Sequence, residues 1–146
     1  MIVLLVVLFG SLLLFRGLGF CGILFLASWR DSTAFALAVM FCFTGLAHFG
    51  RMRSDLEKMM PPWVRNPSAA IYWTGILEIL GAIGLAIPVS RRLAGLCLVL
   101  FLIAVFPANI HAARSVVKLA GRPVTPLWIR GPIQLLFISL IVWVIS

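Results

Sequence analysis

The sequence contains few charged residues. Only 11% of its 146 residues are charged, and four of these are acids, whereas a soluble domain carries roughly 25% charged residues. Hydrophobic residues make up 63% of the chain, and the mean hydropathy is +1.17. This composition excludes an ordinary soluble domain. It predicts an integral membrane protein in which the spans form one compact bundle within the lipid bilayer.

Cysteine is also scarce. The three cysteines, Cys21, Cys42 and Cys97, form no C-x-x-C motif, and each lies within an apolar run. A buried cysteine in such a setting usually behaves as a small hydrophobic residue. The odd number also argues against a complete disulfide framework. We therefore expect no dithiol relay and no metal site.

The net charge of +8 does not arise from a basic tail. Lys and Arg lie between the apolar runs, as in the cytoplasmic loops of membrane proteins. No soluble nucleic-acid-binding module accompanies them, so we expect no nucleic-acid partner. No basic residue precedes the first apolar run, and we therefore predict no cleaved signal peptide.

Four apolar segments are long enough to cross a membrane, which takes roughly 20 residues. Each is bounded by charge, by proline or by both, and they cover Thr33–Phe49, Ala69–Pro88, Leu93–Ala112 and Leu127–Ile145. Within the second of these segments, Gly75, Gly81 and Gly84 are expected to let helices approach closely.

The N-terminal segment Ile2–Trp29 is apolar apart from two serines and Arg16. Two spans do not fit in it, so we predict one long tilted helix followed by a turn, which together make up residues 1–32. Arg16 would then lie near the middle of the membrane, at a cost of at least about 2.5–3.5 kcal/mol unless it pairs or reaches the surface. A break near Arg16 and Gly17 is the alternative.

The segment 51–67, "RMRSDLEKMMPPWVRNP", predicts a short amphipathic helix lying at the membrane interface. Ser54 and Glu57 have the spacing of a capping box, and apolar residues recur at helical spacing after them. An ordinary solvated loop is the alternative.

The distribution of Lys and Arg predicts the orientation. The loops 50–68 and 113–126 together hold seven of them, whereas the two turns on the opposite side hold three. The positive-inside rule then places the longer loops and the N-terminus in the cytoplasm and the C-terminus outside.

The remaining polar residues fall in the cytoplasmic half of the predicted bundle. Three pairs of these residues have i, i+4 spacing, so that each pair shares one helix face. The pairs are Thr44 with His48, Thr74 with Glu78, and Arg130 with Gln134. These faces should turn inward, because a charge in lipid is costly. The candidate ligand-binding set is Thr44, His48, Thr74, Glu78, Asn109, Arg130 and Gln134.

Glu78 is the only acid within a predicted span, and its expected partner is Arg130 or His48. Two interpretations stay open, namely a buried network that fixes helix packing and a ligand or proton site. Asn109 and His111 lie about 200° apart around their helix, so we place Asn109 inside and His111 at the rim. That arrangement disfavours haem ligation by His48 and His111.

Several motifs together resemble the DoxX family of small bacterial membrane proteins. They occur in the family's order and spacing: "GLAHF" (Gly45–Phe49), "PPW" (Pro61–Trp63), "GILEILGAIGLAIP" (Gly75–Pro88), "RRLAG" (Arg91–Gly95), "VFPANI" (Val105–Ile110) and "WIRGPIQ" (Trp128–Gln134). The resemblance covers about residues 33–146 and implies a four-helix bundle in a bacterial inner membrane, to which residues 1–32 add one helix.

The DoxX resemblance implies a link to redox chemistry, because the family is named for a subunit associated with thiosulfate:quinone oxidoreduction. It offers no settled catalytic residues. Its recurrent positions match His48, Glu78, Pro107, Asn109, Arg130 and Gln134 here. The chain lacks the C-x-x-C of thiol-redox relatives, which speaks against dithiol chemistry.

Two functions follow as hypotheses. The first is a membrane subunit that binds a small amphipathic molecule such as a quinone in the polar half, with Glu78 and Arg130 orienting its head group. The second is a non-enzymatic assembly factor or scaffold, as distant receptor-assembly relatives are. A protein partner or a homo-oligomer is compatible with both. Transport fits less well, because the chain has no internal repeat.

Overall fold

The computed structural model describes residues 2–114, 118–119, 122–123 and 125–146. The regular secondary structure of these residues is helical apart from one short antiparallel strand pair. The elements are α1 (Ile2–Phe20), the 3-10 turn η1 (Leu24–Leu26), α2 (Trp29–Ala47), α3 (Arg53–Lys58), α4 (Pro67–Ala86), α5 (Arg91–Arg114), β1 (Lys118–Leu119), β2 (Arg122–Pro123) and α6 (Leu127–Ile145).

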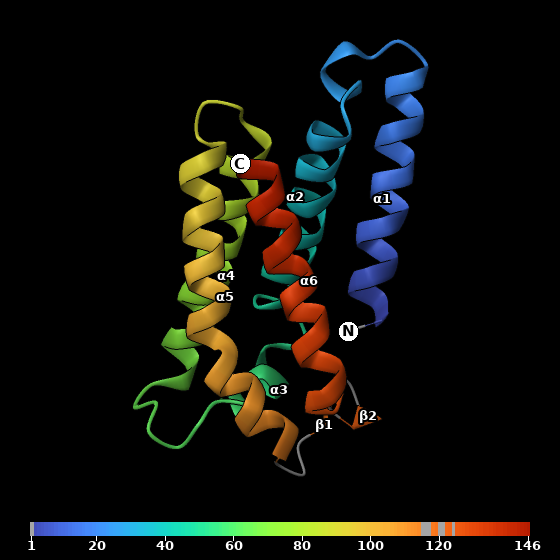
Figure 1. Cartoon of the computed structure of the whole chain (residues 1–146). Coiled ribbons are helices and arrows are strands. Elements are labelled where there is room, and N and C mark those ends of the chain that lie inside the picture. The colour runs from blue at the N-terminus through green and yellow to red at the C-terminus, as the bar shows by residue number, and fades with distance from the viewer. Residues whose placement is uncertain (1, 115–117, 120–121, 124) are drawn as a thin grey trace.

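Five long helices lie side by side and alternate in direction along the chain (Figure 1). Helix α2 packs against α4, α4 against α5, α5 against α6, and α6 returns to contact α2. Helix α1 lies outside this ring and packs on α2. The short helix α3 lies at the end of the molecule where α2 and α5 finish and where α4 and α6 begin (Figure 1).

Four of the described helices are long and apolar enough to cross a membrane, namely α1, α4, α5 and α6. Three of them match the predicted spans within two residues at each end. Helix α2 has 19 residues and begins at Trp29, and the next two residues, Arg30 and Asp31, make its first turn polar. The composition and the helix lengths thus indicate a helical membrane protein.

The distribution of side chains between interior and surface also fits a lipid environment. Large apolar residues such as Leu100 and Leu135 are more than 60% exposed on the outside of the bundle. Contiguous apolar surface of this kind is rare on soluble monomers. In contrast, charged Glu78 and Arg130 are buried. The core itself is apolar and contains Leu37, Phe41, Ala82, Leu85, Leu98 and Ile141.

Glycines bring α4 close to its neighbours. A Cβ at Gly75 would lie 2.7 Å from the Cβ of His48 on α2, and one at Gly81 would lie 2.5 Å from the Leu98 side chain on α5. Gly84 has a similar contact with Ala94 at 2.6 Å. The predicted role of these glycines in close helix packing is confirmed.

The prediction of one helix over residues 2–29 is wrong, because α1 ends at Phe20. Gly22 then adopts a positive φ of 101°, which reverses the chain into η1. Arg16 therefore lies one turn from the end of α1 instead of near its middle. Its Nη1 donates to the Ala27 carbonyl at 2.6 Å, and its guanidinium lies 4.1 Å from the centre of the Phe20 ring.

Helix α3 forms within the predicted interfacial segment, but the predicted capping box does not. The N-cap residue is Met52, with no side-chain cap, and Ser54 lies inside the helix. Glu57 accepts instead from Arg53 Nε at 3.1 Å, one turn earlier. An ion pair at i, i+4 spacing has replaced the cap because both side chains lie on one helix face.

Candidate functional site

Six of the seven polar residues predicted for the site form two clusters among the described residues. The first joins α2 to α4 through Thr44, His48 and Glu78. The second joins α5 to α6 through Asn109, Arg130 and Gln134. Both are placed by the alternation of helix direction, which brings the end of α5 next to the start of α6.

In the first cluster, His48 and Glu78 approach each other at the α2–α4 contact. The distance from His48 Nδ1 to Glu78 Oε2 is 3.5 Å. The same nitrogen is 2.9 Å from the Thr44 carbonyl, which can only accept a hydrogen bond, so Nδ1 carries the proton and directs it there. Glu78 Oε2 consequently remains without a hydrogen bond among the described residues.

The two threonines of the predicted set differ in position. Thr44 lies next to the Glu78 carboxyl and donates to carbonyls of its own helix, with Phe41 O at 3.1 Å. The Thr74 hydroxyl donates to the Ile71 carbonyl at 2.9 Å. This hydrogen bond within α4 brings Thr74 into neither cluster.

The second cluster is a chain of hydrogen bonds between α5 and α6. Arg130 Nη1 donates to Asn109 Oδ1 at 2.8 Å, and Asn109 Nδ2 donates to Gln134 Oε1 at 3.4 Å. Gln134 Nε2 in turn donates to the Leu102 carbonyl at 2.6 Å. Pro107 lies inside α5 and removes one backbone donor from this part of the helix. Asn109 thus faces the interior, as predicted.

Of the two partners expected for Glu78, His48 is confirmed, whereas Arg130 forms no ion pair with it. The ion pairs of the described residues are His48–Glu78, Arg53–Glu57, Lys58–Asp55 and Arg91–Asp31, and none includes Arg130. Sequence spacing placed both residues at one end of the bundle but did not fix how the helices rotate. The His48 imidazole lies against Glu78, and the Arg130 guanidinium donates instead to the Asn109 amide oxygen.

Each cluster leaves one buried polar atom without a hydrogen-bond partner among the described residues. These atoms are Glu78 Oε2 and Arg130 Nε. Leaving a buried polar group unsatisfied costs about 1–3 kcal/mol, and native structures contain few such groups. A third such atom, Arg16 Nε, belongs to a guanidinium that stacks on aromatic rings. The first two lie in the candidate site.

His111 lies in the last turn of α5 and is half-buried, so its predicted place at the membrane rim stays a prediction. Its ring centre is 6.4 Å from that of Trp63, in the segment that follows α3.

Among the described residues, no group of three or more His, Cys, Asp or Glu side chains could hold a metal ion. The three cysteines are free thiols.

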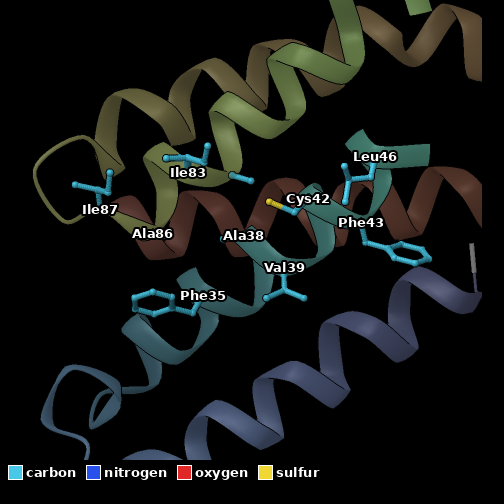
Figure 2. A pocket seen from close by; sticks show the side chains of 10 residues that line it. Phe35, Ala38, Val39, Cys42, Phe43, Leu46, Ile83, Ala86 and Ile87 are labelled. Atoms are coloured by element: carbon cyan, nitrogen blue, oxygen red, sulfur yellow. The ribbon is translucent and has the colours of Figure 1, made fainter. Parts of the chain in front are cut away.

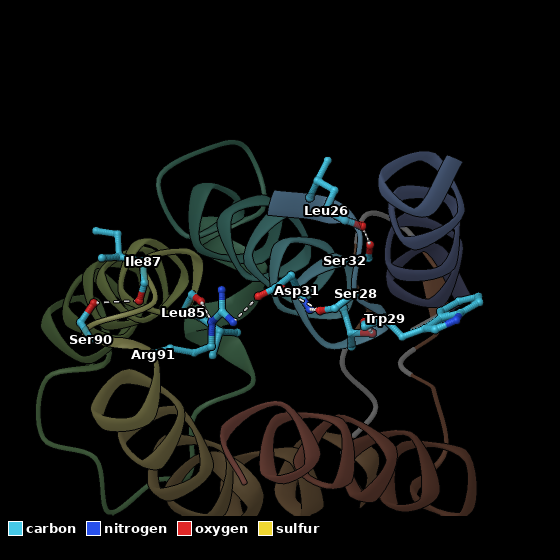
Figure 3. Close-up of polar contacts among 10 residues, drawn as sticks. Leu26, Ser28, Trp29, Asp31, Ser32, Leu85, Ile87, Ser90 and Arg91 are labelled. Atoms are coloured by element: carbon cyan, nitrogen blue, oxygen red, sulfur yellow. Dashed lines mark hydrogen bonds and ion pairs between the residues drawn. The ribbon is translucent and has the colours of Figure 1, made fainter. Parts of the chain in front are cut away.

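The opposite end of the bundle holds a polar cluster that sequence reasoning missed (Figure 3). Ser28 caps α2 by accepting from the Asp31 amide at 3.0 Å, and its hydroxyl donates to Asp31 Oδ2 at 2.6 Å. Arg91 Nη1 donates to Asp31 Oδ1 at 2.6 Å, and its Nε donates to the Leu85 carbonyl at 3.1 Å. One signal was present, since Asp31 is the only acid at this end.

The electrostatics of Asp31 follow from these contacts. Burial alone would raise the pKa of this carboxyl, but the hydrogen bonds from Ser28 and Arg91 outweigh it and hold the pKa below its ordinary value. Asp31 precedes the apolar part of α2, at the edge of the bundle. It is therefore ionised at neutral pH and fully paired.

Comparison with known proteins assigns the family. A model described as a domain of unknown function, DUF8561, matches residues 37–146. The chain belongs to this family. The matched region begins inside α2, leaves out α1 and includes every residue of both clusters. No curated protein and no solved structure matches the chain. The comparisons make no link to DoxX proteins, so that resemblance stays a prediction.

Proposed function

We propose that this protein is a multi-pass membrane subunit that binds a small amphipathic molecule such as a quinone within the polar half of its helix bundle. The observation that carries the proposal is the pair of buried atoms without partners, Glu78 Oε2 and Arg130 Nε. A bound polar head group would supply the missing hydrogen bonds. The DoxX resemblance adds an association with membrane redox chemistry.

The chemistry of the two atoms restricts the ligand. Arg130 carries only donors, so its partner must present an acceptor oxygen. Glu78 offers a carboxyl oxygen that lies against His48, at 3.5 Å from Nδ1, and this pair could exchange a proton with a ligand hydroxyl. A quinone has acceptor oxygens when oxidised and hydroxyls when reduced, so it matches both kinds of group.

The proposal includes a topology in which α1, α2, α4, α5 and α6 all cross a bacterial inner membrane. Their alternating direction requires α2 to span if its neighbours do (Figure 1). The α3 end and the N-terminus would face the cytoplasm, because Arg51, Arg53 and Lys58 lie there together with the basic loop after α5. Reporter fusions at both termini test this orientation.

The decisive experiment measures binding of decylubiquinone to purified wild type and to Glu78→Gln. Loss of one hydrogen bond to a buried polar group, about 1–3 kcal/mol, should weaken binding about tenfold to a hundredfold. Glu57→Gln, on α3 outside the bundle interior, is the matched control and should bind like the wild type. Native mass spectrometry of the same preparations would show any molecule that co-purifies.

The alternative function, an assembly factor or scaffold, predicts another result. The polar clusters would then serve only to fix the packing of the helices. Glu78→Gln would keep full ligand binding, or the wild type would bind no quinone at all, and the thermal stability of the variant in detergent would fall. A protein that co-purifies in place of a small molecule would also support the scaffold.

A further inference from the structure

Two apolar grooves lie on the described surface of the bundle, and they differ in one respect. The larger, of about 520 Å³, runs between α2 and α4 and is lined by side chains such as Phe35, Val39 and Ile83 (Figure 2). Its one heteroatom-bearing side chain is the Cys42 thiol. The smaller, of about 340 Å³, lies between α5 and α6 and has Gln134 among its lining residues.

One residue of the second polar cluster, Gln134, therefore lines the α5–α6 groove. Gln134 lines the groove and also accepts from Asn109, which in turn accepts from Arg130. Arg130 is 5% exposed, and its Nε has no partner among the described residues. The remaining lining residues are Ile103, Phe106, Gly131, Leu135 and Ile138.

The absence of a side chain at Gly131 keeps this groove open. A Cβ added there would meet no heavy atom within 4 Å. Ile103 and Leu135, on either side, are more than half exposed on the apolar outer surface. A lipid-soluble molecule could thus enter from the bilayer without passing through water. The volume lies at the lower end of small-molecule sites, roughly 300–1,000 Å³, and suits one ring or chain better than a two-chain phospholipid.

We infer that the amphipathic ligand docks laterally in the α5–α6 groove, with its apolar tail along Ile103 and Leu135 and its head group at the Gln134–Asn109–Arg130 cluster. The inference rests on the proposed function and names the binding position and ligand class, a quinone with a single apolar tail. The acceptor oxygen of the quinone complements the donor-only guanidinium of Arg130. The α2–α4 groove, which offers no such donor, would stay empty of quinone.

The test uses the full-length protein in detergent and a photoreactive azidoquinone with a decyl tail. Gly131→Leu fills the groove without meeting other protein atoms, and it should weaken binding at least tenfold and abolish labelling of α5 and α6. Gly10→Leu on α1 is the matched control, since a Cβ there also meets nothing within 4 Å. It should bind and label like the wild type.

A second variant guards against misfolding of Gly131→Leu, which precedes Pro132. Ile103→Trp fills the groove from α5, and Leu100→Trp, on the same helix but outside the groove, is its control. Normal binding by Ile103→Trp, or labelling confined to the α2–α4 groove, would overturn the inference. If Glu78→Gln still weakens binding in that case, the proposed function stands without it. No binding to wild type would overturn the proposed function and the inference together.

Discussion

Charged side chains at the two ends of the bundle differ in how they are paired. At one end, Arg91 on α5 donates to Asp31 on α2 and to the Leu85 carbonyl near the end of α4, so that it connects three helices. Ser28 caps the start of α2 by accepting from the Asp31 amide. At the other end, Glu78 and Arg130 each have one polar atom without a partner among the described residues, and they do not pair with each other. The first arrangement is what a fold needs for stability. The second leaves hydrogen-bonding capacity for another molecule.

The end of the bundle that holds the Asp31–Arg91 pair is called the paired end. We predict the largest loss of stability for a substitution there. Arg91→Gln removes the contact with Asp31 and the hydrogen bond to the Leu85 carbonyl. Breaking a fully buried pair costs 3–5 kcal/mol and an exposed one up to about 1 kcal/mol, so we expect about 2 kcal/mol for this partly exposed pair. Thermal unfolding in detergent should show a decrease of several degrees in Tm.

Arg92→Gln is the control for that measurement, because Arg92 is the exposed neighbour of Arg91. Its Tm should stay close to that of the wild type. Quinone binding should be unchanged in both variants once the protein is folded. An Arg91→Gln variant as stable as Arg92→Gln would show that the paired end does not stabilise the bundle.

A pair of isosteric substitutions sharpens the contrast between the two ends. Asp31→Asn should lower the free energy of unfolding by about 1–2 kcal/mol, because two charge-assisted hydrogen bonds are weakened. Glu78→Gln, in ligand-free protein, should change it by less than about 1 kcal/mol, since Oε2 has no hydrogen bond to lose. Chemical or thermal unfolding of both variants under one condition gives the comparison. Greater destabilisation by Glu78→Gln than by Asp31→Asn would instead support a purely structural role, in which the polar clusters fix the packing of the helices.

Much of the architecture could be predicted from the sequence, because charge and proline bound the spans that became α4, α5 and α6. The end of α1 could not, since the residues on both sides of the turn are apolar and hydropathy does not detect the break. The alternative of a break near Arg16 and Gly17 came closer, and the chain reverses a few residues later, at Gly22 with its positive φ.

The site was predictable in outline only. Alternating helices placed Glu78, Asn109 and Arg130 at one end, and the structure brings Asn109 and Arg130 into contact. Which of His48 and Arg130 approaches Glu78 depends on helix rotation, which sequence spacing does not determine. The pairing of Asp31 with Arg91 was missed for another reason: the two residues are 60 positions apart, and Arg91 was counted only as a loop charge.

The smallest expected effect is a pH dependence confined to the paired end. The pKa of Asp31 is lower in the folded protein than its ordinary value, because the hydrogen bonds from Ser28 and Arg91 outweigh the effect of burial. Its contribution to stability is therefore fully present above the unfolded pKa of about 3.9 and is lost as the pH falls through the folded pKa. The difference in Tm between wild type and Asp31→Asn should stay constant from about pH 7 to 5 and shrink below about pH 4. A difference that already shrinks between about pH 7 and 5 would mean that the pKa of Asp31 is raised and that the paired end does not hold an ionised carboxylate.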